Sequence, residues 1–126
     1  MEKAKIIERL RSFGYEYDES SDSFSLEFAI ERVTNHILNE INCEEIPDRL
    51  IPIAIDMVCG EFLKIQKAFR KIDDIAFEQI ANNIRLGDAN VQFVTESTPE
   101  QKFDAAVDYL LSGYESDFAC FRKMVW

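Results

Sequence analysis

The chain is poor in the residues on which most metal and nucleophilic sites depend. Its 126 residues include one histidine, His36, with three cysteines and four glycines. With one imidazole and no C-x-x-C spacing, neither a Cys/His zinc site nor a Cys/His catalytic pair is predicted. Gly87 stands alone, outside any G-x-x-x-x-G-K-[ST] run, so no phosphate-binding loop is predicted either. We therefore expect no catalytic residue, no cofactor and no bound metal.

The cysteines are too few and too scattered for a disulfide framework. Cys43, Cys59 and Cys120 are odd in number, and each lies beside apolar residues. Isolated cysteines in such surroundings are typical of small core residues in a reducing compartment.

Long apolar runs are also missing. No stretch approaches the roughly 18 residues of a membrane span, and no charged segment followed by an apolar one opens the chain as in a signal peptide. The expected protein is soluble, made in the cytosol and free of membrane segments.

Basic residues are outnumbered by acidic ones, 14 to 24, which gives a formal charge of −10. Such a field repels a phosphate backbone, so tight binding to DNA is not expected.

The acidic pairs Asp73-Asp74 and Glu44-Glu45 are interpreted as solvated residues at helix starts. A two-carboxylate hydrolase is the enzymatic alternative, but paired acids arise by chance in a chain this acidic.

Apolar residues, at 47% of the chain, are enough for one domain with a real core. Their spacing predicts an all-α fold, a small bundle of about five to six helices. The first helix precedes Gly14, and a turn follows from which Tyr15 or Tyr17 packs back on the core. Asp22 or Ser23 is expected to cap the second helix, which runs to about Asn42.

A central helix is predicted from Pro47 to Phe69, because this stretch is apolar around most of its circumference at about 100° per residue. Pro52 requires either a distorted first turn or a start near Ile51. Ile53 and Leu63 lie beside the polar stripe, so the helix has neighbours on nearly every side or contacts a second subunit there. Gly60 in mid-helix predicts a close helix crossing.

The fourth helix is expected to begin at Asp73 or Asp74 and to end at Gly87. Alternation in 88–97 favours a short extended segment or loop. Thr98, Pro99 and Gln101 then form a strong start signal for a fifth helix. The C-terminal residues 112–126 end on an apolar aromatic, which indicates docking on the core or on a partner.

The order of DMVCGEFLK, LGDANVQF, TPEQKFD and FRKMVW along the chain resembles the head-to-tail connector, or head-completion, proteins of tailed bacteriophages and prophages. The likeness spans nearly all of residues 1–126, which we interpret as a single connector-type domain. It implies a structural virion protein with no enzymatic activity. Such subunits form a ring of roughly a dozen copies below the portal protein, where a closed rotational symmetry requires two unlike faces.

The resemblance further implies the partners and the location. The ring would meet the portal protein above and the next connector or tail-completion protein below, at the head-to-tail junction of the virion, after assembly in the bacterial cytoplasm. DNA would pass through a partly acidic channel without specific binding. Together with the apolar surface, these considerations predict the assembly contacts Ile53, Leu63, Asp88, Asn90, Val91, Phe93, Phe118, Phe121, Arg122 and Trp126.

A second interpretation remains open on the residues alone. A small acidic helical interaction or regulatory protein, acting without ring assembly, would show the same composition and the same helices.

Overall fold

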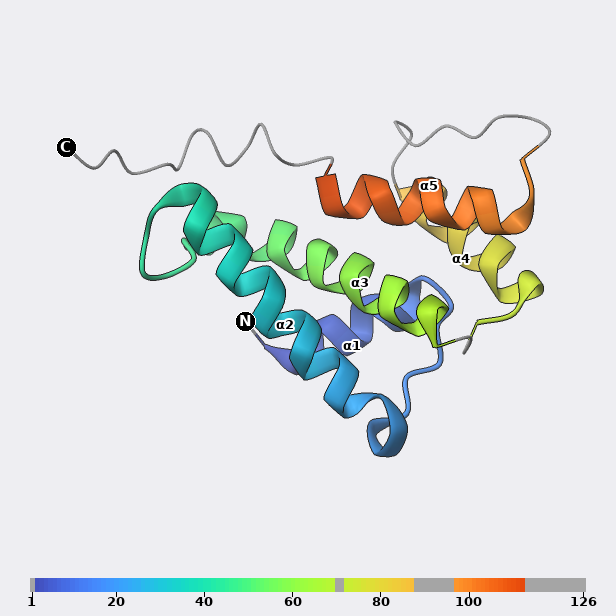
Figure 1. Ribbon diagram of the computed structural model, residues 1–126, viewed down its shortest axis with the longest axis horizontal. Helices are drawn as coiled ribbons and strands as arrows, with labels where there is room; N and C mark the ends of the chain where they lie inside the picture. Colours follow the sequence, from blue (N-terminus) through green and yellow to red (C-terminus); the bar gives the residue numbers. More distant parts are fainter. Residues whose placement is uncertain (1, 70–71, 88–96, 113–126) are drawn as a thin grey trace.

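Five α-helices account for most of the computed structural model, which describes residues 2–69, 72–87 and 97–112 (Figure 1). No strand occurs within these ranges, so the prediction of an all-α bundle is confirmed. The elements are α1 (Lys3–Ser12), α2 (Glu19–Ile41), the 3-10 turn η1 (Asp48–Leu50), α3 (Ile51–Ala68), α4 (Asp74–Gly87) and α5 (Pro99–Ser112).

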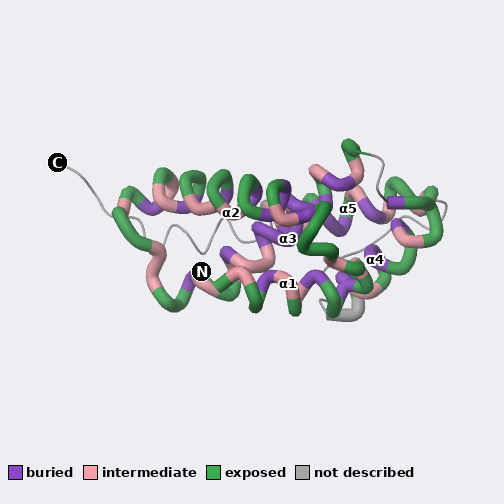
Figure 2. Tube along the Cα trace, turned by 90° about the horizontal axis from the view of Figure 1, so that it is seen from below, coloured by how far each residue is buried: buried purple, intermediate pink, exposed green. Residues whose placement is uncertain are grey.

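Helix α3 is the centre of the bundle, as its apolar circumference predicts. It packs against α1, α2 and α5. Figure 2 shows α3 buried or half-buried along most of its length, whereas α2 has a buried inner side and an exposed outer side. Its fully buried side chains include Phe62 and Leu63. Burial of one such side chain contributes about 1.5–3 kcal/mol, which makes α3 the main source of apolar stabilisation.

The start of α3 combines the two alternatives predicted from the sequence, a distorted first turn after Pro47 and a helix that begins near Ile51. Pro47 precedes the 3-10 turn, and the α-helix proper begins at Ile51 with Pro52 in its first turn. A proline there removes an amide that has no partner within the helix, so it costs little.

The start of α2 differs from the prediction. The helix begins at Glu19, and its cap is Asp18, whose Oδ1 accepts a hydrogen bond from Ser20 N at 3.1 Å. Asp22 is not a cap but a buried side chain, 3% exposed. Both aspartates have the chemistry of a cap, and Asp22 Oδ2 itself accepts a hydrogen bond from Asp18 N at 3.1 Å.

The caps of α4 and α5 follow the sequence signals. Ala76 N donates to Asp73 Oδ1 at 2.8 Å. At α5, Gln101 N donates to Thr98 Oγ1 at 3.2 Å and Thr98 N donates to Gln101 Oε1 at 3.0 Å, which is a reciprocal capping box. The helical spacing of Ile75 with Ile80 and Ile84 suits the inner face of α4, but Ile75 is 80% exposed and Phe77 is buried in its place.

Helices α4 and α5 run parallel to each other. Near the start of both, the rings of Phe77 and Phe103 are 4.7 Å apart, and Lys102 Nζ lies 3.4 Å from Glu78 Oε1. In contrast, α5 is antiparallel to α3, since Lys67 near the end of α3 pairs with Asp104 near the start of α5. Helix α5 therefore points away from the beginning of α4 (Figure 1).

Gly60 marks the crossing of α3 and α5. A Cβ atom added to Gly60 would lie 3.0 Å from Leu110 Cβ and 3.2 Å from Leu111 Cγ. The missing side chain thus lets the two helices approach closely, which confirms the predicted crossing. Leu63 lies one turn further along this face and is fully buried.

A buried polar cluster joins the start of α2 to the end of α3. Gln66 Nε2 donates to Tyr15 Oη at 2.6 Å and to Asp22 Oδ1 at 2.8 Å, while Tyr15 Oη donates to Asp22 Oδ2 at 3.1 Å. The Tyr15 ring packs edge-on against Phe62, with centroids 5.2 Å apart. The predicted return of a tyrosine to the core is confirmed, and the cluster fixes the connection between α1 and α2.

The crossing at Gly60 predicts an asymmetric response to substitution. Gly60→Val should lower the free energy of unfolding by about 2 kcal/mol or more, because its methyl groups would overlap Leu110. Gly60→Ala should change it less, since a helix-propensity gain of about 1 kcal/mol offsets the tight contact. Urea unfolding measures the free energy of unfolding of both variants. The control is Ala105→Val, a substitution at an exposed position of α5. A Gly60→Val protein as stable as the wild type would contradict the close crossing.

The cluster also predicts a loss of stability in alkali. Burial raises the pKa of Tyr15 from its usual 10 to about 12. The folded protein therefore retains this proton more strongly than the unfolded chain, so the stability contribution is complete below pH 10 and is lost as the pH rises towards 12. In thermal unfolding followed by circular dichroism, Tyr15→Phe should be less stable than the wild type at pH 7 and should lose less stability between pH 10 and 12. An equal loss in both proteins would argue against this assignment.

Candidate assembly surfaces

Large apolar side chains are exposed on two parts of the described surface. Phe24 and Phe28 lie one turn apart on the outer side of α2, and are 80% and 48% exposed. Phe69 at the end of α3 is 63% exposed, and Ile75 in the first turn of α4 is 80% exposed. A lone exposed apolar residue is ordinary, but an aromatic pair on one helix face is typical of a contact with another molecule. We call Phe24 and Phe28 the aromatic ridge.

The aromatic ridge was not predicted from the sequence, although the sequence contains a signal for it. Leu26, Val33 and Ile37 mark the inner stripe of α2, and Phe24 and Phe28 lie outside it on the same helical wheel. Two aromatics on the polar side of an amphipathic helix are thus recognisable in the sequence once the inner stripe is defined.

A groove lies between the α1–α2 connection and the first half of α4. It has a volume of about 440 Å³. The described residues that line it are Gly14, Tyr15, Glu16, Ile72, Asp73, Ile75, Ala76, Gln79 and Ile80. Its apolar side chains come from α4 and from Ile72, two residues before α4, and its charged residues, Glu16 and Asp73, are both acidic. We call it the acidic groove.

Two local features shape the acidic groove. Gly14 has a φ of +93°, a left-handed conformation that lets the chain turn sharply after α1. Asn83 Nδ2 donates to Phe13 O at 2.9 Å, which ties α4 to this turn. A Cβ atom on Gly14 would lie 3.0 Å from Asn83 Nδ2, so the glycine also permits the close approach of α4.

A second groove, of about 410 Å³, lies between α1 and α3. Its charged residues are of both signs, Lys5, Glu8, Arg9 and Asp56. Arg9 Nε donates to Asp56 Oδ1 at 2.9 Å, so these two charges satisfy each other. The electrostatics of this groove favour no particular partner.

The thiols and the histidine form no catalytic grouping in the described part of the chain. Burial raises the pKa of the Cys59 thiol, which lies 3.8 Å from Ile6 O. Such a thiol is a poor nucleophile, because the thiolate is the reactive form. Cys43 is half-buried, and His36 is exposed on α2. Within the described ranges no three metal-binding side chains gather, and no helix is long and apolar enough to cross a membrane.

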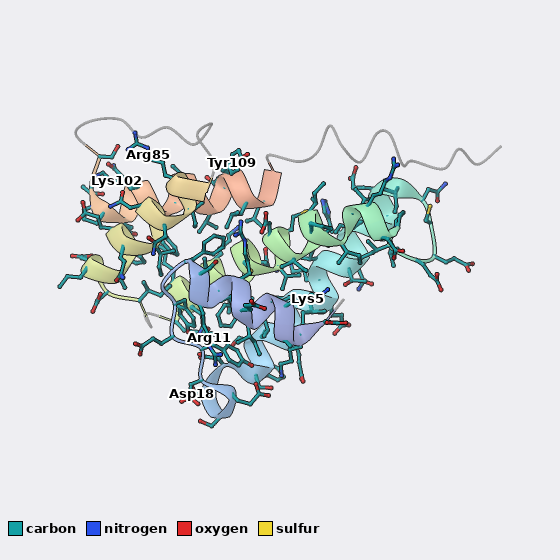
Figure 3. All side chains as sticks on the ribbon, turned by 180° about the vertical axis from the view of Figure 1, so that it is seen from behind. Lys5, Arg11, Asp18, Arg85, Lys102 and Tyr109 are labelled. Atoms are coloured by element: carbon teal, nitrogen blue, oxygen red, sulfur yellow. The ribbon has the colours of Figure 1, made fainter. Side chains whose placement is uncertain are left out.

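Charged side chains are dispersed over separate elements. In Figure 3, Arg11 of α1 and Asp18 lie at one end of the view, and Arg85 of α4 and Lys102 of α5 lie at the other. The charge pairs that do form are structural. Lys67 Nζ binds Glu100 and Asp104 at 2.9 and 2.6 Å; burial works to lower its pKa, but these hydrogen bonds raise it overall.

The predicted assembly contacts fare differently. Leu63 is fully buried within its own chain, so the prediction that it contacts a second subunit is wrong. Ile53 is half-buried and packs against the core. The remaining predicted contacts lie outside the described residues, as does Cys120: Asp88, Asn90, Val91, Phe93, Phe118, Phe121, Arg122 and Trp126.

Comparison with known proteins gives no relative. No family model, no curated protein and no solved structure matches the chain.

Proposed function

We propose that this protein is a structural subunit that assembles into a ring and acts as a head-to-tail connector of a phage or prophage virion. The observation that carries the proposal is the presence of exposed apolar surface on two different parts of the monomer. The aromatic ridge lies on α2, and Ile75 lies in the acidic groove beside α4. A ring subunit requires two unlike surfaces that join by rotation, and this pair of surfaces supplies candidates for them.

The order of the sequence motifs supports the choice of this class of assembly. The connector-like segments DMVCGEFLK and TPEQKFD supply the central helix α3 and the capped start of α5. The proposal assigns the chain no catalytic step and no cofactor. Its partners are further copies of itself, the portal protein and the next connector or tail-completion protein.

The acidic charge of the chain suits a passage for DNA. With 24 acidic and 14 basic residues, the ring would carry a strongly negative charge. An acidic channel wall would repel the phosphate backbone and let DNA move without being held. The proposed location is the head-to-tail junction of the virion, reached after assembly in the host cytoplasm.

The aromatic ridge also favours a second candidate function. An aromatic pair at positions i and i+4 of a helix is a common anchor for the groove of an unrelated partner. A small acidic interaction or regulatory protein, working as a monomer or dimer, would use Phe24 and Phe28 in this way.

Native mass spectrometry of the full chain distinguishes the two functions. At high protein concentration, alone or with a portal protein, we expect closed rings of roughly a dozen subunits, the number implied by the resemblance to connectors. Negative-stain microscopy would show the same particles. A chain that stays monomeric or dimeric under both conditions would contradict the connector and favour the regulatory protein.

The C-terminal residues provide a further prediction. Removal of 118–126 should leave a folded helical domain, because the described core from α1 to α5 ends at Ser112. The shortened chain should no longer enter rings or head-to-tail complexes. Circular dichroism tests the fold, and sedimentation with the assembled partner tests the docking. A truncated chain that unfolds would show that these residues belong to the core and would overturn their assignment to docking.

A further inference from the structure

We infer that the acidic groove of one copy binds the C-terminal segment 118–126 of the next copy. This inference rests on the proposed self-assembly and identifies the contact that would produce it. It is carried by three observations: the chemistry of the groove, the composition of the segment and the direction of α5.

The groove has the chemistry of a receptor for a basic, apolar segment. Its exposed apolar surface is mainly Ile75, which is 80% exposed, with the half-buried Ala76 beside it, while Ile72 and Ile80 are buried. No basic side chain is among the described residues that line the groove, where Glu16 and Asp73 carry the charge. A partner that covers this apolar surface and brings positive charge would be attracted by these carboxylates.

The segment 118–126, with the sequence FACFRKMVW, matches that requirement. It contains three aromatic residues, Phe118, Phe121 and Trp126, and its only charged residues are Arg122 and Lys123. It is therefore both apolar and positive in a chain whose formal net charge is −10. Aromatic residues and arginine are also the side chains that contribute most to binding at protein interfaces.

The direction of α5 favours a neighbouring copy over the same chain. The groove lies at the start of α4, and α5 begins beside it, where Lys102 lies 3.4 Å from Glu78. From there α5 runs away from the groove to Ser112, and Leu110 near its end lies at the crossing with Gly60 (Figure 1). The chain thus leaves the described domain about 20 Å from the start of α5, at 1.5 Å per residue over its 14 residues. The segment leaves the domain at one end and the groove lies at the other, so the segment of one copy can bind the groove of the next. Such head-to-tail contacts form a ring when the rotation between neighbouring copies closes on itself.

Binding of a labelled peptide to the full chain tests the inference directly. The probe is a fluorescent peptide of residues 118–126 carrying Cys120→Ser, followed by anisotropy at low ionic strength. We expect saturable binding to the wild type and at least about tenfold weaker binding to Ile75→Lys. The matched control is Phe24→Lys, which changes an equally exposed residue, 80% in both cases, on the aromatic ridge. This control should bind the peptide as the wild type does.

A charge exchange makes the test specific for the groove. The peptide with Arg122→Glu and Lys123→Glu should bind the wild type at least about tenfold more weakly, and the Glu16→Lys chain should recover part of that loss. Absence of saturable binding up to about 1 mM, or equal binding to Ile75→Lys and the wild type, would overturn the inference. Absence of saturable binding would also be the result if the C-terminal segment of each chain filled the groove of the same chain, an arrangement that the inference excludes.

A mixing experiment separates this inference from the proposed function. One chain is full-length and carries Ile75→Lys, and the other lacks residues 118–126. Native mass spectrometry should find no rings of either chain alone and one-to-one pairs on mixing, because only one groove and one segment remain compatible. If Ile75→Lys alone forms wild-type rings, the inference fails while the connector function stands, and the C-terminal segment is then available to the portal protein. If the peptide binds the groove but no wild-type ring forms, with or without a portal protein, the connector function fails instead.

Discussion

The contact between α3 and α5 at Gly60 is the one on which the rest of the structure depends. The α4–α5 pair contacts the first three helices mainly through α5, because α4 packs chiefly on α5. The absence of a side chain at Gly60 lets the end of α5 lie directly on α3, with Leu110 in the space that a Cβ atom would need. This approach buries Leu63 and gives α3 its third helical neighbour. It also places α4 so that its first half forms one wall of the acidic groove.

Much of the fold was predictable because its signals are local. A capping box, a left-handed glycine after α1 and a proline in the first turn of α3 each act over a few residues, and all occur where the sequence indicates them. Signals that depend on tertiary contacts were misinterpreted. Asp18 and Asp22 are equally good caps, and only the bonds from Gln66 and Tyr15 explain why Asp22 is buried. Similarly, the exposure of Ile75 depends on how α4 packs, since its helical spacing alone suits the core.

The candidate surfaces were less predictable than the helices. Glu16 and Ile75 are 59 positions apart in the sequence, and the fold brings both to the same groove. No motif announces such a site, because its character comes from two segments that have no local relationship. Leu63 shows the opposite error: an apolar residue beside a polar stripe suggests an interface, but this one is fully buried within its own chain. A helix with little polar surface therefore predicts many neighbours without saying which of them are intramolecular.

The parallel orientation of α4 and α5 has a consequence for how the chain folds. Two helices joined by a short loop form an antiparallel hairpin and can stabilise each other early, whereas a parallel pair requires the chain to return along the length of the first helix before any contact forms. Because closing that connection costs entropy before it gains contacts, we expect α1, α2 and α3 to associate first and to provide the surface on which α5 docks. The last elements to fold are the least protected against local opening. The groove would then sit at the boundary between the early and late parts of the domain, where binding of a partner can stabilise the late part most.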